Sequence, residues 1–153
     1  MKLRNYINIA LIIIWMITIF AFSNQNSDDS TSLSDKVIIK IAEIGNKELT
    51  LNEEEKLINK YHLITRKTAH FLSYFILSTL IIILLLDLKI PKKYVITLIF
   101  CFFYACTDEF HQLFINGRNG SLIDVLIDTV GAISSLLLIY LITILKKNHI
   151  KNN

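Results

Sequence analysis

The sequence contains little that would interrupt a helix. It has one proline, Pro91, and four glycines, at positions 45, 117, 120 and 131. Both residue types end helices or weaken them from within, and most of these five fall between hydrophobic blocks rather than inside them. We therefore expect long, nearly unbroken helices.

Cysteine and the common nucleotide motifs are also scarce or absent. The two cysteines, Cys101 and Cys106, lie five residues apart in one hydrophobic block, where a helix does not bring their sulfurs together, so we expect no disulfide between them. The chain has no glycine-rich phosphate loop, zinc-finger spacing or extended basic surface. We therefore expect neither a nucleotide nor a nucleic acid as a partner.

Hydrophobic residues are abundant. They make up 53% of the 153 residues, and the mean hydropathy is +0.50. They form four blocks, which predict membrane-spanning helices at about 7–22, 67–88, 94–114 and 121–145. A bilayer core of roughly 30 Å needs about 20 helical residues, so only the first block is short. We predict an all-α membrane protein, one domain over residues 1–153, with a bundle of four transmembrane helices.

The first block has a second interpretation. Lys2 and Arg4 precede it, and Ala21 and Ser23 follow as a pair of small residues, which is also the arrangement of a cleaved signal peptide. We favour a helix that stays attached to the protein.

The density of basic residues predicts how the chain crosses the membrane. The two termini and the turn near Pro91 contain eight basic residues and a single acid, Asp87; the basic residues are Lys2, Arg4, Lys89, Lys92, Lys93, Lys146, Lys147 and Lys151. Elsewhere, eight basic residues are diluted by twelve acids. Because short basic segments stay in the cytoplasm, we predict a multi-pass protein of the cell membrane with both termini cytoplasmic.

Residues 23–66 then form an extracellular segment between the first two spans. Apolar residues recur there at helical spacing, at Leu33, Val37, Ile38, Ile41 and Ile44. This pattern predicts an amphipathic helix on the membrane surface. The acidic run from Glu53 to Glu55 predicts the start of a further short helix, with Asn52 as its cap.

Polar and ionisable residues gather at the outer ends of the four blocks. They are Ser23 and Gln25 after the first block, Arg66, Lys67, His70 and Tyr74 in the second, Asp108, Glu109, His111 and Gln112 in the third, and Arg118, Ser121, Asp124 and Asp128 at the fourth. Helical spacing places the members of each set on one face, so three polar stripes can meet in one cavity that faces the outside.

A position at the level of the lipid headgroups is an alternative explanation for these residues. It suits Arg66, Lys67 and Arg118, whose long side chains reach water easily. It suits Asp124 and Asp128 poorly, because Asp128 lies about two turns into an apolar helix. A charged side chain in a membrane helix costs about 2.5 to 3.5 kcal/mol, so we favour a cluster inside the bundle.

The polar residues resemble the signature of the VanZ-like family of bacterial membrane proteins, named for an accessory protein of teicoplanin resistance. The matching segments are, in order, 23–25, 66–71 with Tyr74, 104–114, Gly117–Arg118, Ser121, 124–129 and Gly131–Ala132. The chain departs from the family at Asn116, where members often have proline. The resemblance implies a protein of the bacterial envelope that lowers sensitivity to lipoglycopeptides such as teicoplanin.

Our working hypothesis is a site for a membrane lipid, namely a lipid-linked cell-wall precursor or a glycolipid of the outer leaflet. Arg66, Lys67 and Arg118 would hold its phosphate or pyrophosphate. The other predicted binding residues are Ser23, Gln25, His70, Tyr74, Gln112, Ser121, Asp124 and Asp128. Binding could shield the lipid from a glycopeptide antibiotic, which is a further possible partner.

The alternative is a membrane enzyme that modifies such a lipid. Its catalytic residues would be His70, Asp108, Glu109 and Asp124. The sequence requires no cofactor, but a divalent metal could assist, and the candidate ligands are His70, Asp108, His111 and Asp128.

Proton-coupled transport is the least favoured function. The cytoplasmic halves of the second, third and fourth blocks contain only hydroxyl side chains as polar interruptions, at Ser78, Thr79, Thr97 and Thr143. A polar path to the inside of the cell is therefore missing.

Overall fold

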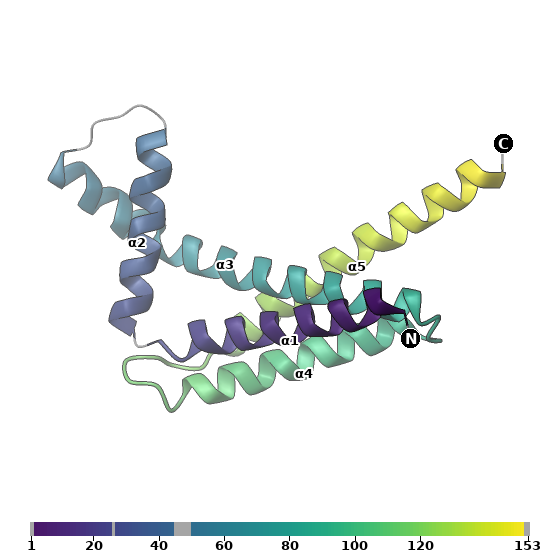
Figure 1. Ribbon diagram of the computed structural model, residues 1–153. Helices are drawn as coiled ribbons and strands as arrows, with labels where there is room; N and C mark the ends of the chain where they lie inside the picture. The colour runs from purple at the N-terminus through teal and green to yellow at the C-terminus, as the bar shows by residue number, and fades with distance from the viewer. Residues whose placement is uncertain (1, 26, 45–49, 152–153) are drawn as a thin grey trace.

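The computed structural model is all-helical and describes residues 2–25, 27–44 and 50–151. The helices of the described chain are α1 (Leu3–Ser23), α2 (Ser27–Ile44), α3 (Leu51–Asp87), α4 (Lys93–Gln112) and α5 (Leu122–Lys151). The predicted all-α class is confirmed. In Figure 1, α1 and α4 lie beside the second half of α3, α2 crosses α3 steeply, and the end of α5 extends beyond the other helices.

Three of these helices are long and apolar enough to cross a membrane: α1, α3 and residues 122–149 of α5. Their length and composition indicate a membrane protein. The fourth predicted span corresponds to α4, whose C-terminal part contains Asp108, Glu109 and His111. These polar residues lower its hydropathy, so α4 is not among the three, and a bundle of four spans stays a prediction.

Helix α1 is packed into the bundle. The indole N–H of Trp15 donates to the Ser73 carbonyl oxygen at 2.9 Å, and the Tyr104 hydroxyl donates to the carbonyl oxygen of Met16 at 2.8 Å. Ile12 and Ile19 belong to the buried core. These contacts favour the attached helix over the signal peptide.

Helix α3 differs from the prediction at its start. The sequence predicts a short helix near residue 53 and a separate span from residue 67, whereas one helix of 37 residues runs from Leu51 to Asp87. No proline or glycine occurs between Thr50 and Pro91 to end it. Asn52 is not the cap. The backbone N–H of Thr50 donates to the Glu53 carboxylate at 3.0 Å, which is one half of a capping box; the other half joins the Thr50 side chain to the Glu53 backbone. The Thr50 hydroxyl also donates to this carboxylate, at 2.9 Å.

The predicted amphipathic helix is present as α2 and packs against α3. Ile38 is buried, whereas Val37, Ile41 and Ile44 are exposed. An exposed apolar face on a helix that leaves the bundle is suited to a membrane surface. The extracellular position of residues 23–66 remains a prediction.

Helices α3 and α5 approach each other closely at Gly131. A Cβ atom at this position would overlap the carbonyl oxygen of Phe71. Just beyond it, the Ser78 hydroxyl donates to the Ala132 carbonyl oxygen at 3.1 Å. Small residues let membrane helices come this close, so this contact fixes α5 against α3.

The two ends of the bundle are defined by contacts between distant residues. Arg4, at the start of α1, pairs with Asp87, at the end of α3. Ser23, at the end of α1, meets Asp108, near the end of α4. The N-terminus and the turn between α3 and α4 therefore share one end, and the polar ends of α1 and α4 share the other.

Candidate functional site

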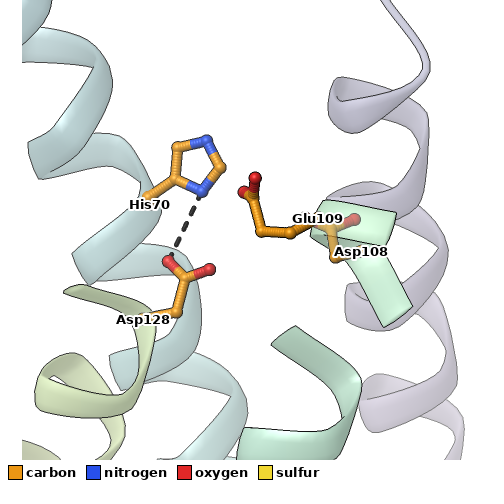
Figure 2. Close-up of side chains that lie close together, drawn as sticks. All are labelled: His70, Asp108, Glu109 and Asp128. Carbon is orange, nitrogen blue, oxygen red and sulfur yellow. Dashed lines mark ion pairs between the residues drawn. The ribbon is translucent and has the colours of Figure 1, made fainter. Parts of the chain in front are cut away.

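Four ionisable side chains meet at the polar end of the bundle. His70 comes from α3, Asp108 and Glu109 from α4, and Asp128 from α5, and each offers one atom able to bind a metal, all within 4.8 Å of one another. We call these four residues the acid–histidine cluster. Figure 2 shows the Glu109 carboxylate pointing toward the His70 ring, with Asp128 on the neighbouring helix below the ring.

His70 and Asp128 form the pair between α3 and α5. The His70 Nδ1 atom lies 3.4 Å from Asp128 Oδ1, as the dashed line in Figure 2 marks. Asp128 is fully buried, and neither of its oxygens has a hydrogen-bond partner among the described residues. His70 and Asp128 are therefore close enough to form an ion pair, but their atoms are not aligned for a hydrogen bond. A buried carboxylate in this state is costly, so Asp128 has the capacity to hold a proton or a cation.

The two acids of α4 are held by neutral donors. The Ser23 hydroxyl donates to Asp108 Oδ2 at 2.8 Å, and the Gln112 amide donates to Glu109 Oε1 at 3.0 Å and to Asp108 Oδ2 at 3.4 Å. The backbone N–H of Ser121 donates to Glu109 Oε2 at 2.8 Å. This network fixes the ends of α1 and α4 and the start of α5 around the cluster.

A cavity of about 340 Å³ lies against the acid–histidine cluster. It is lined by Ile19, Phe22, Ser23, Gln25, Leu33, Ser34, Val37, Thr65, Arg66, Ala69, His70, Ser73, Tyr74, Asp108 and Arg118. His70 and Asp108 belong to both the cavity and the cluster, so the cluster forms part of the cavity wall. Apolar side chains from α1 and α2 form much of the rest.

Arg118 brings a buried positive charge to the cavity. Its guanidinium donates to the Phe22 carbonyl oxygen at 3.2 Å, and its Nε atom has no partner among the described residues. Burial, and then the nearby charge of Arg66, lower the pKa of Arg118 from its ordinary value. That ordinary value is so high that the side chain stays charged.

Arg66 and Lys67 are paired with Asp124. The Lys67 ammonium lies 3.0 Å from Asp124 Oδ1, and an Arg66 nitrogen lies 3.8 Å from Asp124 Oδ2. Asp124 and Lys67 do not line the cavity. The partners of Asp124 are therefore two residues of α3, and Arg118 points to the end of α1 instead.

The structure divides the predicted site residues into three groups. Ser23, Gln25, Arg66, His70, Tyr74, Asp108 and Arg118 line the cavity. Glu109 and Asp128 lie beside His70 and Asp108 in the cluster. Gln112 bridges the acids of α4, Ser121 contributes its backbone N–H rather than its hydroxyl, and Lys67 and Asp124 form an ion pair outside the cavity.

His111 lies apart from the cluster, although the sequence made it a candidate metal ligand. Its ring nitrogen Nε2 is 3.2 Å from the Asn24 side-chain oxygen, and its ring stacks on Phe20 at 4.6 Å. Glu109, which the sequence made a candidate catalytic residue, lies near His70 in place of His111. Leu33 and Val37 also line the cavity but were not among the predicted site residues, although their spacing on one face of α2 was a signal.

The fold and the site define an all-helical membrane protein whose ionisable residues gather in a cavity at one end of its bundle. The profile of a family described as VanZ/LLP1 matches residues 8–144. The chain belongs to this family, which confirms the resemblance seen in its motifs. No curated protein and no solved structure was found to be similar to the chain.

Proposed function

We propose that this protein binds the anionic headgroup of a lipid-linked envelope molecule at the outer leaflet of the cell membrane. The cavity carries the proposal, because it joins two arginines, Arg66 and Arg118, to apolar side chains of α1 and α2. A lipid-linked phosphate or pyrophosphate matches both features, because its headgroup is negatively charged and its chain is apolar. Arginine is suited to this task, because its planar guanidinium matches the oxygens of a phosphate.

Arg118 is the residue best placed to hold the headgroup. It is buried, and its guanidinium bonds to a carbonyl oxygen rather than to a carboxylate. Its Nε atom has no partner among the described residues. Arg66 is less free, since it also faces Asp124. An anionic ligand would therefore satisfy Arg118 first.

The size of the cavity favours a headgroup over a whole glycopeptide. Its volume of about 340 Å³ is near the lower end of small-molecule sites, which span roughly 300 to 1,000 Å³. Lower sensitivity to teicoplanin, which the family resemblance implies, would then come from shielding the lipid-linked target of the drug.

The proposal includes four spans, with the site facing outward. Helix α4 has 20 residues and packs against α1, α3 and α5, and 20 helical residues are about the length that a bilayer core requires. Its polar end lies with the acid–histidine cluster, at the opposite end from the Arg4–Asp87 pair. The basic ends of the chain favour the cytoplasm, which puts the cluster outside.

Native mass spectrometry of the purified full-length protein tests the binding of a lipid. We expect a co-purified anionic lipid on the wild-type protein and its loss from Arg118→Ala, because the buried phosphate partner is removed. Arg4→Ala is the matched control, since Arg4 lies at the opposite end with Asp87, and it should keep the lipid. Equal lipid content in all three proteins, or none in the folded wild type, would contradict the proposal.

Catalysis on the same lipid is the second candidate, and one observation favours it. Asp108 lines the cavity beside His70, and its Oδ1 atom has no partner among the described residues. A carboxylate in this position can act as a general base on a water molecule at the headgroup. Release of the headgroup from a lipid-linked pyrophosphate by the purified protein would distinguish catalysis from binding alone.

A further inference from the structure

We propose that His70, Asp108, Glu109 and Asp128 form a binding site for one divalent cation of the manganese or zinc type. One ligand-type atom from each lies within 4.8 Å of the others. Ligands bonded to such a cation at about 2.1 Å lie at most about 4.2 Å apart. Small side-chain rotations are therefore enough to close the group around a cation.

The strongest support is Asp128. It is fully buried, and its carboxylate points to His70 (Figure 2). Neither of its oxygens has a hydrogen-bond partner among the described residues. Asp108 is also buried, and its Oδ1 atom has no hydrogen-bond partner within the described chain. Buried polar atoms are nearly always satisfied, so these oxygens indicate a ligand that protein groups do not replace.

The charges around the cluster lead to the same conclusion. Its three carboxylates have one direct basic neighbour within the described chain, His70. The nearby cations are bonded elsewhere: Lys67 and Arg66 face Asp124, and Arg118 donates to Phe22. Buried charges need a partner or a metal. A divalent cation would neutralise two of the three carboxylates and leave His70 as a neutral ligand.

The ligand types point to the kind of cation. Carboxylate oxygens suit magnesium, calcium and manganese, whereas imidazole suits zinc and other transition metals. One imidazole with three carboxylates is a mixed set that both manganese and zinc accept. Neighbouring groups hold the ligands in place, as metal sites require: the Ser23 hydroxyl binds Asp108, and the Gln112 amide and the Ser121 N–H bind Glu109.

The cation would also explain how an anionic headgroup can lie beside three acids. His70 and Asp108 form part of the cavity wall, so a cation bound to them would place positive charge behind that wall and remove the repulsion. This role in ligand binding rests on the proposed function. The cation site itself does not, since it is defined by protein groups alone.

Titration of the purified full-length protein with Mn²⁺ tests the site in the absence of added lipid. After treatment with EDTA, electron paramagnetic resonance should show about one bound Mn²⁺ per chain. Pulsed measurements should detect coupling to a ring nitrogen of His70, and His70→Gln should abolish that coupling. Asp128→Asn should weaken binding at least about tenfold, because loss of a ligand costs no less than loss of a supporting group.

Asp87→Asn is the matched control, because Asp87 lies at the other end with Arg4, and it should bind Mn²⁺ like the wild type. The proposal is overturned if the folded wild type binds neither Mn²⁺ nor Zn²⁺, if bound Mn²⁺ shows no nitrogen coupling, or if folded Asp128→Asn binds it equally well. Should Asp128→Asn fail to fold, the wild-type stoichiometry and the nitrogen coupling still decide. Metal binding without lipid retention, or the reverse, would separate the two proposals.

Discussion

At the scale of single residues, Ser23 holds the end of α1 against α4. Its hydroxyl donates to Asp108 at 2.8 Å, and both residues are buried. The second donor to the same oxygen, Gln112, is distant at 3.4 Å. Asp108 therefore depends on Ser23 for its best hydrogen bond.

Replacing Ser23 with alanine should destabilise the protein. The change leaves a buried carboxylate without its main donor, which costs about 1–3 kcal/mol in the free energy of unfolding. Thermal unfolding in detergent should show a lower midpoint for Ser23→Ala. Thr18→Ala is the control, because the exposed Thr18 hydroxyl bonds only to the Ile14 carbonyl within α1; equal midpoints for the two variants would show that the Ser23 bond contributes nothing.

The sequence predicted which residues share a face of each helix, but not how the helices are rotated against each other. Spacing placed Lys67 with His70 and Asp124 with Asp128. The structure pairs the members in register, Lys67 with Asp124 and His70 with Asp128. The pairing depends on the close approach of α3 and α5, which no local pattern encodes.

At the scale of helices, Gly131 sets the distance between α3 and α5. A side chain there would meet the backbone oxygen of Phe71, which cannot move aside as a flexible side chain can. The three ion pairs between α3 and α5, two at Asp124 and one at Asp128, lie on the side of this contact nearer the polar end of the bundle. Separating the helices would therefore disturb the acid–histidine cluster as well.

Gly131→Ala tests this contact. Overpacking costs about 1–3 kcal/mol, which exceeds the gain of up to about 1 kcal/mol from the better helix former. We expect a lower midpoint of thermal unfolding. Ser134→Ala is the control on the same helix, since the Ser134 hydroxyl bonds only to Val130 of α5. An unchanged or raised midpoint for Gly131→Ala would show that α3 and α5 can separate at no cost.

The helices themselves were largely predictable, and the failure at α3 has a clear cause. Hydrophobic blocks and the apolar spacing of residues 33–44 predicted α1, α2, α4, α5 and most of α3. The start of α3 was wrong because hydropathy marks where a helix enters the bilayer, not where it begins. The capping pair of Thr50 and Glu53 was the better signal.

At the scale of the whole molecule, the site lies at one end of the bundle and the basic termini at the other. Arg4 and Asp87 mark the basic end, and Ser23 and Asp108 mark the polar end. Each transmembrane helix carries the chain from one side of the membrane to the other. The side of the membrane on which each turn lies therefore gives the number of spans, and it decides whether α4 is one of them.

Single cysteines, in a protein whose Cys101 and Cys106 are replaced by alanine, should reveal this order. Because basic segments stay in the cytoplasm, cysteines at Lys2 and Pro91 should be protected from a membrane-impermeant maleimide in intact cells, while cysteines at Asn52 and Asn116 should react. All four positions are exposed to solvent outside the packed bundle, so protection would reflect the membrane rather than burial.

Opening the cells should make the first pair react, which is the internal control. If the cysteines at Pro91 and Asn116 are both protected until the cells are opened, α4 does not cross the membrane. The acid–histidine cluster would then lie on the cytoplasmic side, where an outer-leaflet lipid cannot reach it.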